Sequence, residues 1–132
     1  MTSNSVAFWL VALFGIGLIA VGAASLVAPQ TAAAMFGVPA GDASTPAYIW
    51  AAGTRDIALG CFALVLVGLR VNARVVGAFM LVAALIPVGD LINVYVNAGG
   101  DSRKPLALHG VSIVFLVAIG CWLCRTDRAA RP

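Results

Sequence analysis

The sequence predicts an all-α integral membrane protein, a four-helix bundle with both termini in the cytoplasm. Of the 132 residues, 62% are hydrophobic and only 10% are charged, whereas about a quarter are charged in soluble domains. Four apolar segments each reach the length of about 20 residues that a helix needs to cross the hydrocarbon core. These observations exclude a soluble enzyme and predict one domain, residues 1–132, with the lipid bilayer as its surroundings.

The predicted spans cover residues 7–27, 47–69, 74–96 and 105–124. No Lys or Arg precedes the first span, and its apolar run is longer than the 7–15 residues, roughly, of a signal peptide, so we expect a retained helix. The long linker after it is punctuated by Pro and Gly, and residues 31–36 are expected to form a short interfacial helix. A tight turn at 70–74 and a polar loop at 97–104, broken at Gly99-Gly100, connect the other spans.

The basic residues predict the orientation. With four spans, one side of the membrane carries five arginines, namely Arg70, Arg74, Arg125, Arg128 and Arg131. The other side carries only Arg103 and Lys104. Positive charge is retained in the cytoplasm, so both termini are expected there, with residues 125–132 as a short basic tail. The basic residues are spread singly, which excludes a nucleic-acid partner, and the Ala- and Arg-rich composition favours a bacterial inner membrane.

Four ionisable side chains fall within the predicted spans: Arg55, Asp56, Asp90 and His109. Each costs on the order of 2.5–3.5 kcal/mol to insert, so such groups normally face the bundle interior and have partners. At a rise of about 1.5 Å per residue, all of them lie within roughly 6–12 Å of the outward-facing helix ends. Three separate helices therefore bring charge to the same outer half of the bilayer, where we expect a buried polar pocket.

Local spacing supports close packing at this level. Gly53, Asp56 and Gly60 share one helix face, which places Asp56 on a stripe of small residues. Pro87, three residues before Asp90, is expected to kink the third span. The first span carries Gly15, Gly17 and Gly22. These glycines are expected to make packing contacts, and a homo-oligomer interface at them is an alternative.

The side chains in the predicted pocket suggest acid–base chemistry. The candidate catalytic residues are Asp56, Asp90 and His109, because carboxyl and imidazole groups transfer protons. The candidate ligand-binding residues are Arg55, Asn93 and Ser112. A guanidinium can hold a carboxylate or an enolate-like oxygen. No cofactor is predicted, and no metal, because one histidine with two aspartates is an unusual ligand set for zinc.

Cys121 and Cys124 form a C-x-x-C motif at the cytoplasmic end of the fourth span. Such a motif can act as a thiol–disulfide pair. Here both cysteines lie within one helix, on the reducing side of the membrane. We therefore interpret them as small apolar packing residues.

Four stretches carry a resemblance to a known family. They are Pro29 with Phe36-Gly37-Val38-Pro39, then Gly53-Thr54-Arg55-Asp56-Ile57-Ala58, Pro87-Val88-Gly89-Asp90, and His109-Gly110. From about Gly15 to Leu123 the chain resembles the uncharacterised membrane family catalogued as domain-of-unknown-function family 4267, itself similar in layout to DoxX-like four-helix proteins. The resemblance implies a four-span membrane protein whose characteristic polar positions are the four ionisable residues above, and it implies no activity.

Three functions remain open on the sequence alone. The first is an enzyme that performs isomerisation, cyclisation or hydration on a lipophilic small molecule reached from the bilayer. The second is a protein that binds a lipid or quinone, or that handles ions, without chemistry. The third is a structural accessory subunit in which an Arg55–Asp90 ion pair fixes the helix register. A cavity at the polar residues favours the first two, and a closed, fully paired network favours the third.

Overall fold

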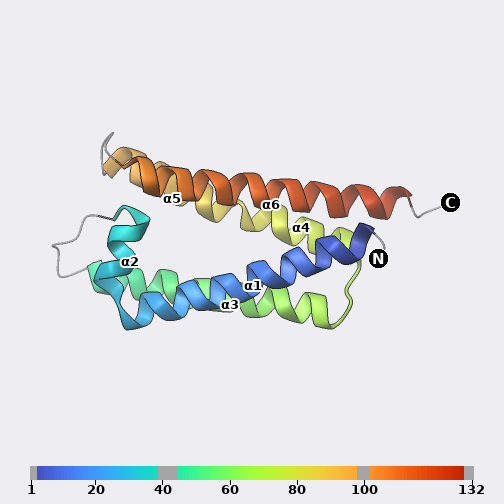
Figure 1. Cartoon of the computed structure of the whole chain (residues 1–132), viewed down its shortest axis with the longest axis horizontal. Coiled ribbons are helices and arrows are strands. Elements are labelled where there is room, and N and C mark those ends of the chain that lie inside the picture. Colours follow the sequence, from blue (N-terminus) through green and yellow to red (C-terminus); the bar gives the residue numbers. More distant parts are fainter. Residues whose placement is uncertain (1–2, 39–44, 98–101, 130–132) are drawn as a thin grey trace.

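The computed structural model describes residues 3–38, 45–97 and 102–129. Within these ranges the chain forms six α-helices and no strands (Figure 1). They are α1 (Ser3–Val27), α2 (Pro29–Phe36), α3 (Thr45–Gly68), α4 (Ala73–Ala83), α5 (Leu85–Asn97) and α6 (Arg103–Ala129). Four segments are long and apolar enough to cross a membrane, namely Ser5–Val27, Thr45–Gly68, Ala73–Asn97 and Arg103–Thr126. Every end lies within two residues of the predicted one, and the all-α fold is confirmed.

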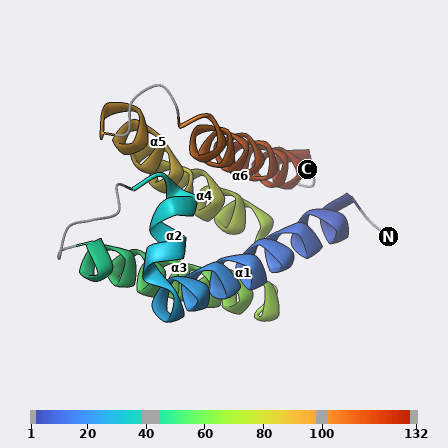
Figure 2. The same ribbon diagram turned by 60° about the vertical axis from the view of Figure 1, so that its left-hand side comes forward.

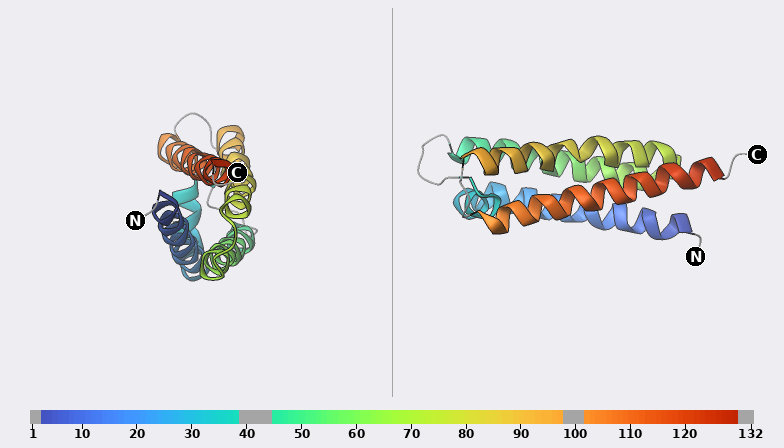
Figure 3. Two further views of the ribbon diagram at one scale, coloured as in Figure 1. Left: turned by 90° about the vertical axis from the view of Figure 1, so that its right-hand side faces the viewer. Right: turned by 90° about the horizontal axis from the view of Figure 1, so that it is seen from above.

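The long helices are arranged as two pairs. Helix α1 packs along α3, and α4 and α5 together pack along α6, whereas contacts between the two pairs are few. The end-on view in Figure 3 (left) shows α5 and α6 on one side and α1 and α3 on the other. Helix α2 contacts α1, α3 and α6, and Figure 2 shows it rising from the first pair toward the second. Both termini lie at the opposite end of the bundle from α2 (Figure 1).

Glycines allow the helices within each pair to approach closely. A Cβ added at Gly60 of α3 would lie 2.5 Å from the carbonyl oxygen of Gly15, and one at Gly53 would lie 2.8 Å from that of Gly22. The predicted packing role is thus confirmed for Gly15 and Gly22, and their partner is α3 of the same chain. Gly17 makes no such contact within the described part of the chain, because an added Cβ there would meet nothing within 4 Å. The homo-oligomer stays a prediction.

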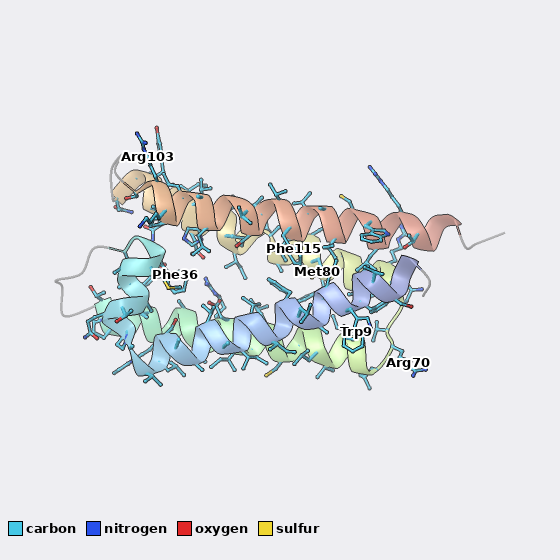
Figure 4. All side chains as sticks on the ribbon, in the orientation of Figure 1. Trp9, Phe36, Arg70, Met80, Arg103 and Phe115 are labelled. Carbon is cyan, nitrogen blue, oxygen red and sulfur yellow. The ribbon has the colours of Figure 1, made fainter. Side chains whose placement is uncertain are left out.

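The main hydrophobic core lies toward the termini, and we call this part of the bundle the closed end. Its buried residues come from both helix pairs and include Ala7, Val11, Ala63, Leu66, Val76, Met80, Leu116, Ile119 and Leu123. In Figure 4, Met80 and Phe115 extend into the space between the pairs. A smaller core of Ala32, Ala33 and Ile49 lies beneath α2. We call the α2 side of the bundle the open end, because the cavities described below are found there.

Proline and glycine set the helix boundaries. The predicted short helix is confirmed as α2, which begins at Pro29 and stops at Gly37, whose φ of +73° is readily adopted by glycine. The predicted irregularity in the third span is confirmed too, because α4 ends at Ala83 and α5 begins at Leu85. Pro87 has no N–H to donate to the carbonyl of Ala83, which interrupts the helix there.

The remaining connections are described in part. The tight turn includes Arg70 at a φ of +52°, followed by Asn72, whose side chain accepts a 2.8 Å hydrogen bond from the Arg74 N–H and caps α4. Residues 39–44 and the predicted Gly99-Gly100 break lie outside the described residues. The basic tail predicted from Arg125 onward begins as helix, because α6 continues to Ala129.

Candidate functional site

A partly open cavity of about 170 Å³ lies between the two helix pairs at the open end. All six helices contribute to its wall or its polar end, and its apolar side chains include Phe14, Leu18, Leu59, Ile86 and Leu116. A smaller cavity of about 40 Å³ lies nearer the start of α3, beside Tyr48 and Ile49. Both cavities are lined by Phe36, Arg55, Asp56, Asp90 and His109. The predicted convergence of charge from three helices is therefore observed, and it lies between the two cavities.

Arg55 joins the two carboxylates. Its Nε donates to Oδ1 of Asp56 at 3.1 Å, and its terminal nitrogen Nη2 lies 3.0 Å from the same oxygen. The same Nη2 lies 3.6 Å from Oδ2 of Asp90. Arg55 thus binds its chain neighbour in two contacts and reaches across to α5 with a longer one, so the expected Arg55–Asp90 pair exists but is secondary.

The expected burial of this cluster is only partly met. Asp56 and His109 are buried, at 7% and 6% exposure. The side chain of Arg55 is 38% exposed and that of Asp90 is 25% exposed. The difference arises because Asp56 lies on the glycine face against α1, whereas Arg55 and Asp90 lie where the two pairs separate. The four ionisable residues are thus not one uniformly buried network.

His109 is held by α2 and not by a carboxylate. Its Nε2 lies 3.4 Å from the backbone carbonyl oxygen of Phe36, to which it donates in the tautomer that carries a proton there. The two rings also lie near each other, with centroids 6.3 Å apart. Across the described residues His109 makes no ion pair with Asp56 or Asp90. The sequence places Phe36 in a stretch that carries the family resemblance but does not predict its contact with His109. Its position before the glycine that ends α2 is a usable signal.

Asn93 and Ser112 lie at different cavities. Asn93 lines the smaller one, and its Oδ1 accepts a 2.6 Å hydrogen bond from Nδ2 of Asn97. Ser112 lines the larger one, and its hydroxyl donates to the carbonyl of Leu108 at 2.9 Å. Because that proton is used within α6, Ser112 can offer a ligand only the acceptor side of its oxygen.

A third cavity opens between α1 and α2. It has a volume of about 270 Å³ and is almost entirely apolar, with Ala24 and Ala32 in its wall. It shares Val21, Met35 and Phe36 with the cavity of about 170 Å³ between the helix pairs, for which we keep the name larger cavity. In Figure 4, Phe36 extends from α2 toward the space between the helix pairs. Met35 and Phe36 therefore separate an apolar groove on the bundle surface from the larger cavity.

The remaining reactive groups do not join this site. In the ranges that the structure describes, no three His, Cys, Asp or Glu side chains come together as metal ligands. The thiols of Cys121 and Cys124 are free. Cys124 lies 3.8 Å from the Arg74 carbonyl, and a Cβ at Gly77 would lie 2.8 Å from its sulfur, so it packs between α4 and α6. This contact agrees with a packing role.

The fold and the site define a small all-helical protein with four helical segments long enough to cross a membrane and with a cavity between them that has charged groups at one end. The family model described as domain of unknown function (DUF4267) matches residues 15–123. The chain therefore belongs to this family, and the resemblance noted in the sequence is confirmed; the DoxX-like layout stays a prediction. No curated protein and no solved structure matches the chain.

Proposed function

We propose that this protein lies in a membrane and binds a lipophilic small molecule in the larger cavity between its two helix pairs. The single observation that carries the proposal is the cavity itself, about 170 Å³ with a mainly apolar wall and with charged groups at one end. Ligand sites generally combine an apolar wall, which supplies affinity, with a few polar groups that fix orientation. The apolar part of the ligand fills the cavity, and its polar group lies against Arg55 and the aspartates.

The cavity volume limits the ligand. An apolar protein cavity of about 150 Å³ stays dry and accommodates benzene. We infer that the larger cavity takes a small hydrophobic molecule or one end of a longer one. The groove between α1 and α2 shares residues with this cavity, which favours access from the bilayer rather than from water.

The charge distribution supports an orientation with both termini in the cytoplasm. Arg70 lies at the end of the bundle where the termini lie, and Arg103 lies at the α2 end (Figure 4). More arginines belong to the terminal side, which is the cytoplasmic side under the positive-inside tendency. The cavity then opens toward the outer half of the bilayer, and we propose a bacterial inner membrane. A reporter fused after residue 132 tests this, because a periplasmic signal contradicts the orientation.

Filling the cavity tests the binding function. Ala83 is buried and lines the cavity, whereas Ala78 lies exposed on the same helix. We expect octanol to raise the unfolding temperature of the wild type and of Ala78→Phe in nanodiscs of zwitterionic lipid, and not that of Ala83→Phe, because a ligand stabilises only a state that binds it. Equal shifts in all three proteins contradict the proposal. Circular dichroism verifies that Ala83→Phe is folded.

A second candidate function is acid–base catalysis on the bound molecule. It is favoured by one observation, the presence of Asp56, Asp90 and His109 around the same cavity. Proton transfer to carbon incorporates solvent deuterium, so incubation with a membrane lipid extract in heavy water can reveal it by mass spectrometry. We expect incorporation with wild type and none with Asp90→Asn or His109→Gln. No incorporation with wild type leaves binding without chemistry.

The structural accessory role predicts an Arg55–Asp90 bridge without a cavity. The described residues have both a bridge and a cavity. The ion pair therefore does not argue against a ligand.

A further inference from the structure

The charged side chains around the two cavities do not balance. Among the described residues that line them, Arg55 carries one positive charge and Asp56 and Asp90 carry two negative charges. This count takes His109 as an uncharged imidazole; with a proton added to that ring, the same side chains balance without a ligand. Arg103 and Lys104 begin α6, are exposed and line neither cavity. One guanidinium can neutralise one carboxylate, so the site keeps one negative charge in apolar surroundings, where an unpaired charge is costly.

The carboxylate oxygens are also incompletely used. Both contacts of Arg55 with Asp56 are to Oδ1, and its contact with Asp90 is to Oδ2. In the described part of the chain, Oδ2 of Asp56 and Oδ1 of Asp90 have no hydrogen-bond donor. The side chain of Asp56 is only 10% exposed. A buried acceptor without a donor is unfavourable, so Oδ2 of Asp56 favours a ligand that donates, whereas Oδ1 of Asp90 belongs to a side chain that is 25% exposed.

The uncharged polar atoms around the cavities also act mainly as acceptors that carry partial negative charge. The carbonyl of Phe36 ends α2, and carbonyl groups at a helix C-terminus carry partial negative charge. Ser112 uses its proton within α6 and offers an acceptor. Donors on the larger cavity are few, because an uncharged His109 uses its one N–H at the Phe36 carbonyl and Arg55 contacts the aspartates through Nε and Nη2, which leaves Nη1. The polar end is therefore mainly an acceptor surface with an excess of negative charge.

We propose that the ligand of this cavity is a lipophilic cation, an amine that is protonated at neutral pH and carries a hydrophobic tail. An ammonium group has up to three donors and no acceptor, which matches the free carboxylate oxygens, and its charge balances the site. This inference rests on the proposed binding function and specifies its ligand class. Its competitor is a proton on one aspartate or on His109, which balances the charge without any ligand and gives no preference for amines.

Three probes with one tail and different head groups distinguish these cases. Octylamine is cationic at neutral pH, octanol is neutral and octanoate is anionic. Binding is measured by the shift in unfolding temperature in zwitterionic nanodiscs, with Ala83→Phe in parallel to subtract effects of the probe on the bilayer. Because a hydrogen bond to a charged group contributes roughly 1.5 kcal/mol or more, we expect octylamine to bind about tenfold more tightly than octanol, and octanoate to bind most weakly.

The outcomes separate the two proposals. Equal affinities for octylamine and octanol, or tightest binding of octanoate, overturn the cationic ligand and leave the binding function standing. If no probe shifts the wild type more than it shifts Ala83→Phe, the binding function itself fails.

Substitution of the carboxylates provides an independent test. In Asp56→Asn the excess negative charge is gone, so we expect the octylamine and octanol affinities to become alike. Asp90→Asn, at a more exposed position, gives the same test if Asp56→Asn does not fold. The reverse change, Asn93→Asp beside the smaller cavity, is expected to widen the preference. A preference for octylamine that survives both Asp→Asn changes overturns the proposal.

Discussion

The closed and open ends of this bundle differ in how the two helix pairs meet. At the closed end, side chains from both pairs form one core, with Val11, Val76, Met80 and Leu123 fully buried. At the open end the pairs are separated by cavities, and the ionisable residues of the spans lie around them. Within the first pair, by contrast, glycines keep α1 and α3 in close contact along both ends. The cavities therefore lie between the pairs, and the close helix contact lies within the first pair.

The largest expected effect is loss of core packing at the closed end. Met80→Ala removes a fully buried side chain and is expected to cost about 2–5 kcal/mol of unfolding free energy. Leu59→Ala, on the wall of the larger cavity, is expected to cost less, because fewer atoms surround that side chain. Denaturant titration in mixed micelles measures both. Equal losses contradict the distinction between the two ends.

The contact within the first pair is expected to give the next largest effect. In Gly60→Ala the new Cβ would lie 2.5 Å from the backbone oxygen of Gly15, which cannot move without shifting a helix. We expect a loss of about 1–3 kcal/mol, as for other overpacked sites. Gly17→Ala is the matched control, because its Cβ meets nothing within 4 Å. It is expected to be neutral or stabilising by up to about 1 kcal/mol, through helix propensity.

The ion pair is expected to contribute less than the packing. Arg55→Leu leaves two carboxylates close together without a cation, and we expect a loss of about 1–2 kcal/mol because Arg55 is 38% exposed. Combining Arg55→Leu with Asp56→Leu is expected to recover much of that loss, since an apolar pair can replace an ion pair. A double-mutant cycle of thermal stabilities gives the coupling. If the losses simply add, the pair is not coupled.

The cysteines provide the smallest expected effect. Cys61 is exposed on α3, and Cys61→Ala is expected to change the unfolding free energy by less than about 0.5 kcal/mol. Cys124→Ala, whose sulfur packs against Gly77, is expected to cost slightly more. Thermal unfolding with and without reductant measures both. A stability that depends on reductant in wild type argues against the packing role of Cys124.

Helical periodicity and depth explain what could be predicted from the sequence. The spans, the face shared by Gly53 and Asp56, and the interruption near Pro87 follow from local rules, because 1.5 Å per residue and 3.6 residues per turn fix depth and direction. Which side chains pair between helices depends on crossing geometry, which these rules do not contain. The contact of His109 with the Phe36 carbonyl and the partial exposure of Asp90 were therefore missed.

The catalytic and ligand-binding roles assigned to these residues stay predictions. All of these side chains except Asn93, which lines the smaller cavity, line the larger cavity, but chemistry depends on a substrate. Sequence composition identifies neither the shape of a cavity nor the group that enters it, because both depend on how the two pairs separate.

Under the proposed membrane location, the contact between Arg55 and Asp56 affects how the chain inserts into the bilayer. The two residues are adjacent in the chain, so their charges can cancel while the segment Thr45–Gly68 is still alone in the translocon. That lowers the cost of inserting either charge. Asp90 has no basic residue next to it in the chain. The segment Ala73–Asn97 therefore inserts with an unpaired carboxyl group, which pairs with Arg55 of α3 only after the segment has entered the lipid. We therefore expect the first two long segments to insert first. The bundle then assembles when Arg55 of α3 pairs with Asp90 of α5.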